Sequence, residues 1–350
     1  MFKDQSQEVG EGGTAIQAAG SVNFNVGISY FEARQIAQDM ARAVFSELTG
    51  IAKETANLRV DEITEKVILK LQNEYPAGLQ KAVDPDFQYA LLTVQKEYAR
   101  NADKDLGDLL IDLLIDRSKQ ETRNILQIVL NESLATAPKL TEGQLGILAI
   151  TFILRYTRNN GLSNEVDFAK YLDEHVQPFI NKSSNNRSSF QHLEFCGCGS
   201  ISVASSINMA LVLRHSYTAF FMKGFDSREI SNRGLTIGLD QRFFMKCIND
   251  ETKYQLRAMN EEALDYDIKD KSISPEDAEI LKGFLSVGLM DENEIQQKVN
   301  SIRPYMSQAF LLWDSSEMKS FTLTSVGMAI GHANAKRLLG QFADLSIWIN

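Results

Sequence analysis

Two cysteines separated by a single glycine, Cys196 and Cys198, are the residues of this 350-residue chain whose types and spacing most suggest chemistry. Two thiols in a glycine-rich turn can bind a metal ion or form a redox pair. A tetrahedral zinc site, however, needs four ligands, usually from Cys-x2–4-Cys pairs with further Cys or His. Cys247 and the four histidines lie at no such spacing. We therefore predict a tight turn that holds two small structural side chains, and no metal.

His192 lies just upstream, and with Cys196 or Ser200 it would form a nucleophile–base pair if a third, orienting group lay beside them. The sequence has no Gly-x-Ser-x-Gly elbow and no other catalytic signature. It also has no Walker loop and no Gly-x-Gly-x-x-Gly, so the usual nucleotide-binding motifs are absent from the sequence. We therefore predict no catalytic residue and no cofactor.

Four aspartates, Asp105, Asp108, Asp112 and Asp116, form the acidic stripe. Their spacing of i, i+3, i+7 and i+11 places them on one face of a helix whose other face carries leucines. Paired carboxylates can hold Mg²⁺ or Ca²⁺. The commoner explanation is the solvated face of an amphipathic helix, and this is what we expect.

A helical body is predicted to begin at Ser29, because Ser29-Tyr30-Phe31-Glu32 has the pattern of a capping box. Apolar residues then recur at helical spacing, and Gly50 is the only interruption before Pro76. This predicts one helix of roughly 60 Å that packs along partners. A break at Gly50 into two helices is the alternative. The apolar positions are Ala33, Ala37, Met40, Val44, Leu48, Ile51, Ala56, Val60, Ile63, Val67 and Leu71.

Further helix starts are indicated by N-cap patterns, in two cases with a proline in the first turn. Residues 182–189 are small and polar, so we place a domain boundary there. The starts are Asp84-Pro85, Thr141-Glu142-Gly143-Gln144 and Ser274-Pro275-Glu276-Asp277, and the helices are expected at about 86–101, 103–135, 141–158, 163–178, 207–222 and 325–339.

The second half mixes helices with short strands. Strands are predicted at 234–239 and 344–349, and residues 321–324 look extended. Residues 281–290 followed by 321–327 have the Gly-Leu and Leu-Thr-x-x-Gly pattern of a winged helix. Between Asp270 and Arg337 there are nine acidic and seven basic residues, so protein contacts are favoured over DNA contacts.

The tail before Ser29 differs in composition from the rest. Residues 14–26 carry no charge and no proline, and residues 21–26 alternate between apolar and polar. One interpretation is an edge strand that joins its own domain. The other is β-stacking between chains, which Gln and Asn ladders favour. The self-association residues would be Ile16, Gln17, Val22, Asn23, Phe24 and Asn25.

The composition is that of an ordinary globular chain with a formal charge of −10. This charge argues against nucleic acid as the main partner and against polybasic attachment to membranes. No signal peptide is visible, and no stretch approaches the roughly 20 apolar residues that span a bilayer. Three cysteines suit a reducing compartment. We therefore predict a cytoplasmic protein without membrane insertion.

Five segments of the chain resemble a family of bacterial proteins of about this length with no assigned biochemical role. The order of parts also resembles the Abi-alpha proteins of abortive phage infection, which implies a role in phage defence. The run Ile16-Gln17-Ala18-Ala19-Gly20 is similar to the Ile-Gln-x-Gly cores of amyloid signalling motifs, with one extra residue before Gly20. The five segments are 26–34, 84–90, 103–110, 321–330 and 342–349.

Taken together, the sequence predicts a mainly α protein. It has a tail at 1–28, a helical domain at 29–181 that contains the long helix and a bundle, and an α+β part at 190–350 with the winged-helix-like segment. We expect a homo-oligomer that acts through protein contacts, with a phage or host protein as partner, in bacterial antiphage defence. The alternatives are a hydrolase or metal-dependent enzyme built on Cys196 and Cys198 or on the acidic stripe, and a nucleic-acid-binding regulator.

Overall fold

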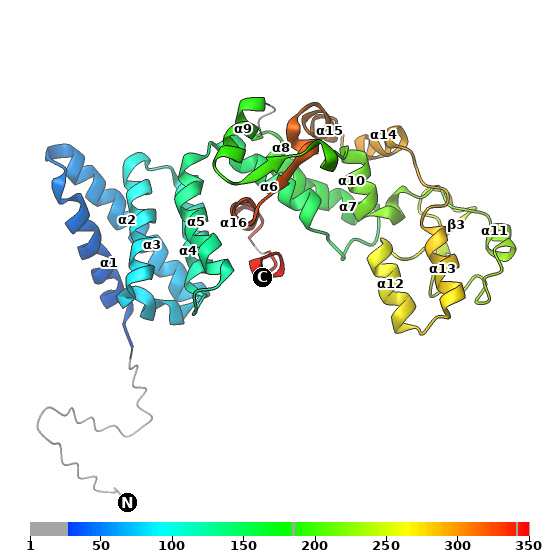
Figure 1. The fold of residues 1–350 in the computed structure, drawn as a ribbon, viewed down its shortest axis with the longest axis horizontal. Helices are drawn as coiled ribbons and strands as arrows, with labels where there is room; N and C mark the ends of the chain where they lie inside the picture. Colours follow the sequence, from blue (N-terminus) through cyan, green and yellow to red (C-terminus); the bar gives the residue numbers. More distant parts are fainter. Residues whose placement is uncertain (1–26, 184–185, 341, 350) are drawn as a thin grey trace, which may run out of the picture.

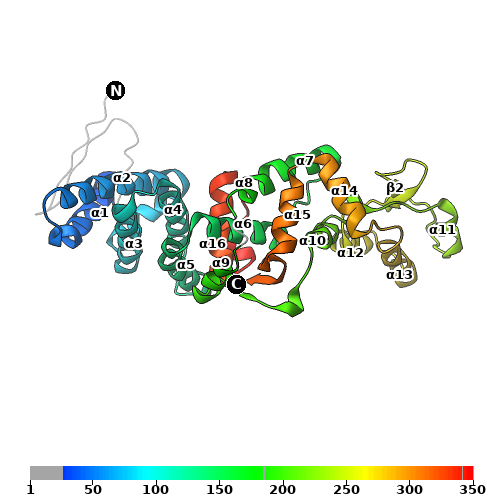
Figure 2. The same cartoon turned by 90° about the horizontal axis from the view of Figure 1, so that it is seen from above.

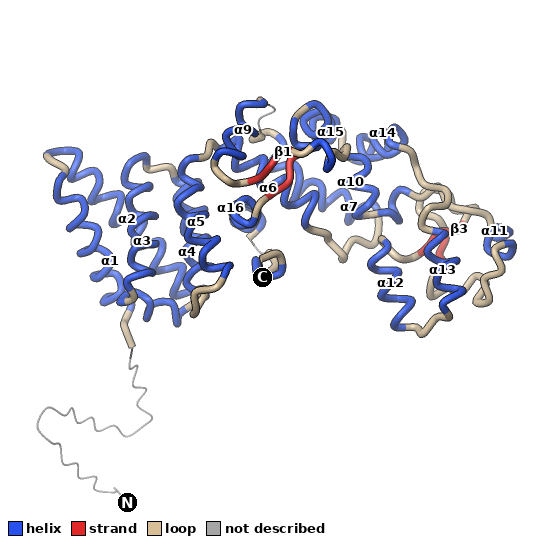
Figure 3. Tube along the Cα trace, in the orientation of Figure 1, coloured by secondary structure: helices blue, strands red, loops and turns tan. Residues whose placement is uncertain are grey.

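The computed structural model describes residues 27–183, 186–340 and 342–349. These residues form an elongated row of helices, with α1 at one end and a small lobe at the other (Figures 1 and 2). Figure 3 shows how little of the chain is in strands. The described strands form two antiparallel pairs, β1 with β4 and β2 with β3. The prediction of a mainly α protein with a small α+β C-terminal part is confirmed.

The first half of the row consists of helices that pack against their neighbours in the chain. The predicted caps are confirmed. Ser29 and Glu32 form the capping box of the first helix, and the Asp84 side chain accepts the Phe87 N–H at 2.9 Å. The elements are α1 (Tyr30–Val44), η1 (Phe45–Glu47), α2 (Gly50–Glu74), η2 (Pro76–Val83), α3 (Pro85–Asn101), α4 (Lys104–Ser118), α5 (Ile125–Thr136) and η3 (Ala137–Lys139).

Two predicted helices are each divided in the structure. The single 60 Å helix is wrong and its alternative is right, because Gly50 has a φ of +55° and the chain turns between α1 and α2. The run 103–135 is also two helices. Asn124 begins α5 by accepting the Gln127 N–H at 2.8 Å, and α5 then packs against α4.

The middle of the row is held together by the last α-helix of the chain, α16 (Ser325–Leu339), which packs against α4, α5 and α6. Two glycines permit this approach: a Cβ on Gly327 would lie 1.8 Å from the Cys198 carbonyl oxygen, and one on Gly331 would lie 2.7 Å from that of Leu148. The other elements are α6 (Glu142–Tyr156), α7 (Glu165–Tyr171), the π-helix η4 (Leu172–Val176), α8 (Gln177–Ile180), α9 (Arg187–Phe195), β1 (Gly199–Ile201) and β4 (Phe321–Leu323).

The far end of the row, from residue 222 to residue 289, has its own hydrophobic core, and we call it the lobe. Met222 and Leu289 pair as an isolated antiparallel bridge where the chain enters and leaves it. The lobe contains α11 (Ser227–Asn232), β2 (Phe244–Lys246), β3 (Tyr254–Leu256), α12 (Glu261–Asp270) and α13 (Pro275–Phe284). The remaining elements outside the lobe are η5 (Val203–Ser205), α10 (Met209–Ser216), η6 (Thr218–Phe221), α14 (Glu292–Ile302), α15 (Met306–Ser315), η7 (Glu317–Ser320) and η8 (Leu345–Ile347).

Two predicted strands are wrong. Residues 234–239 form turns, because Gly234 and Gly238 have positive φ and the Thr236 N–H binds the buried Asp277 carboxylate at 2.9 Å. Residues 344–349 contain the 3₁₀-helix η8. Their alternation misled because Leu345 and Ile349, four residues apart, are the buried pair, which is helical spacing.

The two halves of the winged-helix pattern do not come together. Leu281 lies in the core of the lobe, whereas Phe321 lies in the main core, and β4 pairs with β1. The domain boundary at 182–189 stays a prediction, and the main core takes residues from both sides of it. No helix in the described ranges is both long enough and apolar enough to cross a membrane.

Candidate functional site

The Cys196–Cys198 turn joins α9 to β1. Gly197 has a φ of +72°, and burial raises the pKa of the Cys198 thiol to about 12. The Cys198 Sγ lies 3.9 Å from the Cys196 carbonyl oxygen, and both thiols are free. A thiol with that pKa is protonated and unreactive at neutral pH. The fold therefore gives Cys198 the environment of a packing residue.

Cys196 does meet a histidine. Its Sγ lies 3.5 Å from the Nε2 of His192, one helical turn earlier, and the Nδ1 of His192 lies 2.9 Å from the Nε2 of Gln144. The Gln144 amide is oriented by its neighbours, because its oxygen accepts the Thr141 N–H at 3.0 Å and its nitrogen donates to the Ser189 carbonyl at 2.9 Å.

Two tautomers of a neutral His192 fit these contacts. The Gln144 nitrogen lies 2.9 Å from Nδ1 and the Gln144 oxygen lies 3.3 Å from it, so Nδ1 can accept from the amide nitrogen or donate to the amide oxygen. Only the second arrangement leaves Nε2 free to accept a proton from the Cys196 thiol, as a general base must. The contact therefore brings together the three residue types of a nucleophilic site and is compatible with both tautomers. The spacing of four residues between His192 and Cys196 is the signal that predicts the contact.

The expectation of a solvated acidic stripe holds for half of it and is wrong for the other half: Asp105 and Asp108 are 60% and 46% exposed, whereas Asp112 and Asp116 are only 2% and 12% exposed. α4 is packed between α2 and α16, and each aspartate meets a cation. The pairs are Asp105–Arg337 at 2.5 Å, Asp108–Lys66 at 3.2 Å, Asp112–Lys70 at 2.7 Å, Asp116–Lys336 at 3.1 Å and Asp116–Lys119 at 2.8 Å.

The charge of the stripe is balanced by these side chains. Asp112 is only 2% exposed, and burial raises the pKa of its carboxyl in spite of Lys70. Burial lowers the pKa of Lys336, but Asp116 and Asp112 more than offset this, so its net pKa is raised. Within the described residues, no group of three or more His, Cys, Asp or Glu is placed to hold a metal ion. The stripe here acts as a contact between helices.

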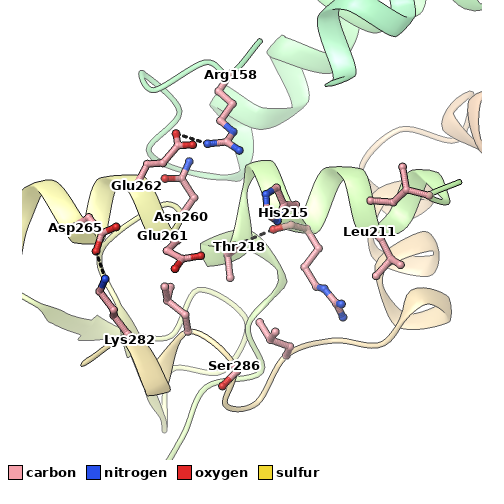
Figure 4. Close-up of a pocket in the computed structure, with 14 residues that line it drawn as sticks. Arg158, Leu211, His215, Thr218, Asn260, Glu261, Glu262, Asp265, Lys282 and Ser286 are labelled. Atoms are coloured by element: carbon pink, nitrogen blue, oxygen red, sulfur yellow. Dashed lines mark hydrogen bonds and ion pairs between the residues drawn. The ribbon is translucent and has the colours of Figure 1, made fainter. Parts of the chain in front are cut away.

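A cleft of about 570 Å³ lies where the lobe meets the body, and we call it the lobe cleft (Figure 4). Its walls come from α10 and η6 on one side and from α12 and the end of α13 on the other. Two ion pairs border it: Arg158–Glu262 joins the segment after α6 to α12, and Asp265–Lys282 joins α12 to α13 within one wall, where the Asp265 carboxylate raises the pKa of Lys282. Its lining is Arg158, Ile207, Leu211, Arg214, His215, Thr218, Asn260, Glu261, Glu262, Asp265, Lys282, Leu285, Ser286 and Leu289.

A second cavity, of about 660 Å³, shares Arg158 and Glu262 with the lobe cleft, and we call it the aromatic cavity. Its rings come from α6, α7, the π-helix η4 and the C-terminal segment. Helices with a π-turn often carry functional side chains. The lining is Arg155, Tyr156, Thr157, Arg158, Asn159, Asn160, Tyr171, His175, Glu262, Phe342, Ala343, Ile347 and Trp348.

The rings of the aromatic cavity are held in place by contacts with one another and with the backbone. His175 stacks on Tyr171 with centroids 4.9 Å apart, and the Trp348 Nε1 donates to the Tyr156 carbonyl at 2.7 Å. Burial lowers the pKa of His175, so its ring is neutral at pH 7. No sequence motif marks this cavity, because its lining residues are up to 193 positions apart in the chain.

The six residues proposed for self-association, Ile16, Gln17, Val22, Asn23, Phe24 and Asn25, lie outside the described residues.

The fold and these cavities define a mainly α-helical protein that has a lobe with its own core and two adjoining cavities at the joint. A protein-family model described as ":-like" matches residues 27–349, so the chain belongs to that family, and its description states no activity. The resemblance to an uncharacterised family is thereby confirmed. No curated protein and no solved structure matches the chain.

Proposed function

We propose that the protein is a self-associating interaction component of bacterial antiphage defence that works in the cytoplasm. The observation that carries self-association is an exposed apolar end on α1 and α2. Ile51 and Leu58 are 82% and 72% exposed, and Val44 and Leu48 in the turn before them are also exposed. Val44, Leu48 and Ile51 belong to the helical repeat of apolar residues in the sequence. In a single chain, however, no apolar side chains cover them.

A second copy of the chain is the partner that fits this end. Ile51 and Leu58 are seven residues apart on α2, so they share one face of the helix, and an isologous dimer would bury that face against itself. The turn between α1 and α2 also lies at the end of the helical row, where no further helix follows (Figure 1). Stacking through the tail would add a second contact between the same chains.

The defence role rests on the resemblance of the order of parts to the Abi-alpha proteins. We expect the assembled form to recognise a partner protein from the phage or the host. The net charge of −10 and the three free thiols fit a cytoplasmic protein whose partner is not nucleic acid.

The test replaces Ile51 with Glu. In a symmetric dimer this removes two apolar side chains, worth about 3–6 kcal/mol of burial, so the dissociation constant should rise by about 100-fold or more. Light scattering of the purified wild type should give at least twice 39.3 kDa, and the variant should approach one chain.

The matched control is Val166→Glu on α7, where the side chain is 77% exposed but lies away from α1 and α2. It should leave both the mass and phage protection intact, while Ile51→Glu should reduce both when each variant is expressed in phage-challenged cells. A wild type that stays at one chain mass at micromolar concentration contradicts self-association. Equal protection with and without the protein contradicts the defence role separately.

A further inference from the structure

The aromatic cavity has the size and composition of a small-molecule site. Its volume of about 660 Å³ falls within the roughly 300–1,000 Å³ usual for ligand pockets. Flat side chains border it from separate segments of the chain: Tyr171 and His175 from α7 and η4, and Phe342 and Trp348 from the C-terminal segment. Rings placed in this way favour a flat aromatic group in the ligand, because such groups stack face to face or edge to face.

The charge of the lining favours an anionic ligand. Two arginines face the cavity, and Glu262 is its one acidic residue. Arg155 is already committed: it donates to the Met318 and Lys319 carbonyls, and its guanidinium lies 5.3 Å from the centre of the Trp313 ring. Arg158 is the remaining guanidinium that a ligand can engage.

Arg158 is held by a partner that it can exchange. Its side chain is 25% exposed, whereas that of Glu262 is 75% exposed. A guanidinium that is largely buried needs a partner, but a carboxylate this exposed is well solvated alone and contributes little to the pair. An anionic group in the cavity can replace it and accept two parallel hydrogen bonds from the guanidinium.

We propose that the aromatic cavity binds a small ligand in which a flat aromatic ring carries an anionic group, with Arg158 as the anchor that exchanges Glu262 for the ligand. A nucleoside monophosphate and an aromatic carboxylate share this chemistry. Because Glu262 lies on α12, the exchange would also release the ion pair that ties the lobe to the end of α6. The inference is independent of the proposed self-association.

The proposal makes an unusual prediction about Glu262. If the carboxylate only stabilises the fold, its removal leaves ligand affinity unchanged or lowers it. If it competes with the ligand for Arg158, Glu262→Gln raises the affinity by about two- to fivefold, the range expected for an exposed ion pair. The matched control is Glu261→Gln: this neighbour on the same helix lines the lobe cleft but not the aromatic cavity.

Tryptophan fluorescence reports on the cavity directly. The chain has two tryptophans, and Trp313 is fully buried while Trp348 lines the cavity. The full-length protein is titrated with adenosine 5′-monophosphate, benzoate, adenosine and inorganic phosphate. Calorimetry repeats each titration, and Trp348→Phe checks that the fluorescence signal arises at the cavity.

We expect saturable quenching by adenosine 5′-monophosphate, by benzoate or by both. The probe that binds with the higher affinity shows whether the ligand is a nucleoside monophosphate or an aromatic carboxylate. Arg158→Ala should weaken binding by about tenfold or more, the loss expected for charged hydrogen bonds. The proposal is overturned if neither probe saturates by about 5 mM. It is also overturned if adenosine or phosphate alone binds as tightly, or if Glu262→Gln behaves as Glu261→Gln does.

Discussion

Replacing Gly327 with alanine should destabilise the protein, although alanine is favoured over glycine inside helices by about 1 kcal/mol. The reason is the close approach of α16 to the turn before β1. The new Cβ would lie 1.8 Å from the Cys198 carbonyl oxygen, well inside the 3.0 Å that real Cβ atoms keep, so the backbone must move by more than 1 Å.

The magnitude follows from the size of that movement. Overpacking a tight site costs about 1–3 kcal/mol, and a clash with backbone belongs at the upper end because no side chain can rotate away. The helix preference offsets about 1 kcal/mol of this. We therefore expect a net loss of about 2 kcal/mol for Gly327→Ala. Gly331→Ala should cost less, since its Cβ would lie 2.7 Å from the Leu148 carbonyl oxygen.

The assay is urea unfolding followed by circular dichroism, read as a change in midpoint at constant slope. Gly283→Ala on α13 is the matched control, because its Cβ would meet only the end of the Arg233 side chain at 3.2 Å. It should be neutral or stabilise by up to about 1 kcal/mol. If Gly327→Ala is as stable as the wild type, α16 does not lie where the structure has it.

Two further predictions concern single side chains. At pH 8 one thiol, Cys196, should react rapidly with a maleimide or a disulfide reagent, because the pKa of Cys198 is raised to about 12 and Cys247 is buried. Cys196→Ser should abolish this phase, and Cys198→Ser should keep it but cost about 1–3 kcal/mol of stability. Burial lowers the pKa of His332 in the folded protein, so the unfolded chain binds more protons at this residue. The free energy of unfolding should therefore fall as the pH drops from about 6.5, the ordinary pKa of histidine, toward the lower pKa of His332 in the folded protein. His332→Gln should flatten that dependence by up to about 1.4 kcal/mol per pH unit, and an unchanged slope would contradict it.

The parts of the fold that the sequence predicts are those with local signals. The Ser29 and Thr141 capping boxes each fix a helix start within four residues, and both form as predicted. The acidic stripe shows the limit of such signals. Its spacing correctly places four aspartates on one face, but Lys70 is 42 residues from Asp112 and Lys336 is 220 residues from Asp116. No local pattern contains those pairings, so the spacing alone predicts a solvated face for all four aspartates.

The same limit applies to the two regions on which the proposals rest. The apolar period through Val44, Leu48 and Ile51 is visible in the sequence, but only the turn at Gly50 shows that a single chain leaves these residues exposed. The aromatic cavity has no sequence signature at all, because α6, α7 and the C-terminal segment that form it are far apart in the chain. Fold class follows from local pattern, whereas sites depend on these long-range contacts.

The exposed apolar end and the aromatic cavity lie far apart along the row, with α3, α4, α5 and α16 between them (Figure 1). Substitutions at distant sites without shared partners usually have additive effects. Ile51→Glu should therefore leave ligand affinity unchanged, and Arg158→Ala should leave the oligomeric mass unchanged. If the ligand instead alters the mass, the coupling must pass through elements that contact both halves, and α16 is the element that packs against α4 and α6 together. Gly331→Ala, which disturbs the contact between α16 and α6, should then weaken that coupling.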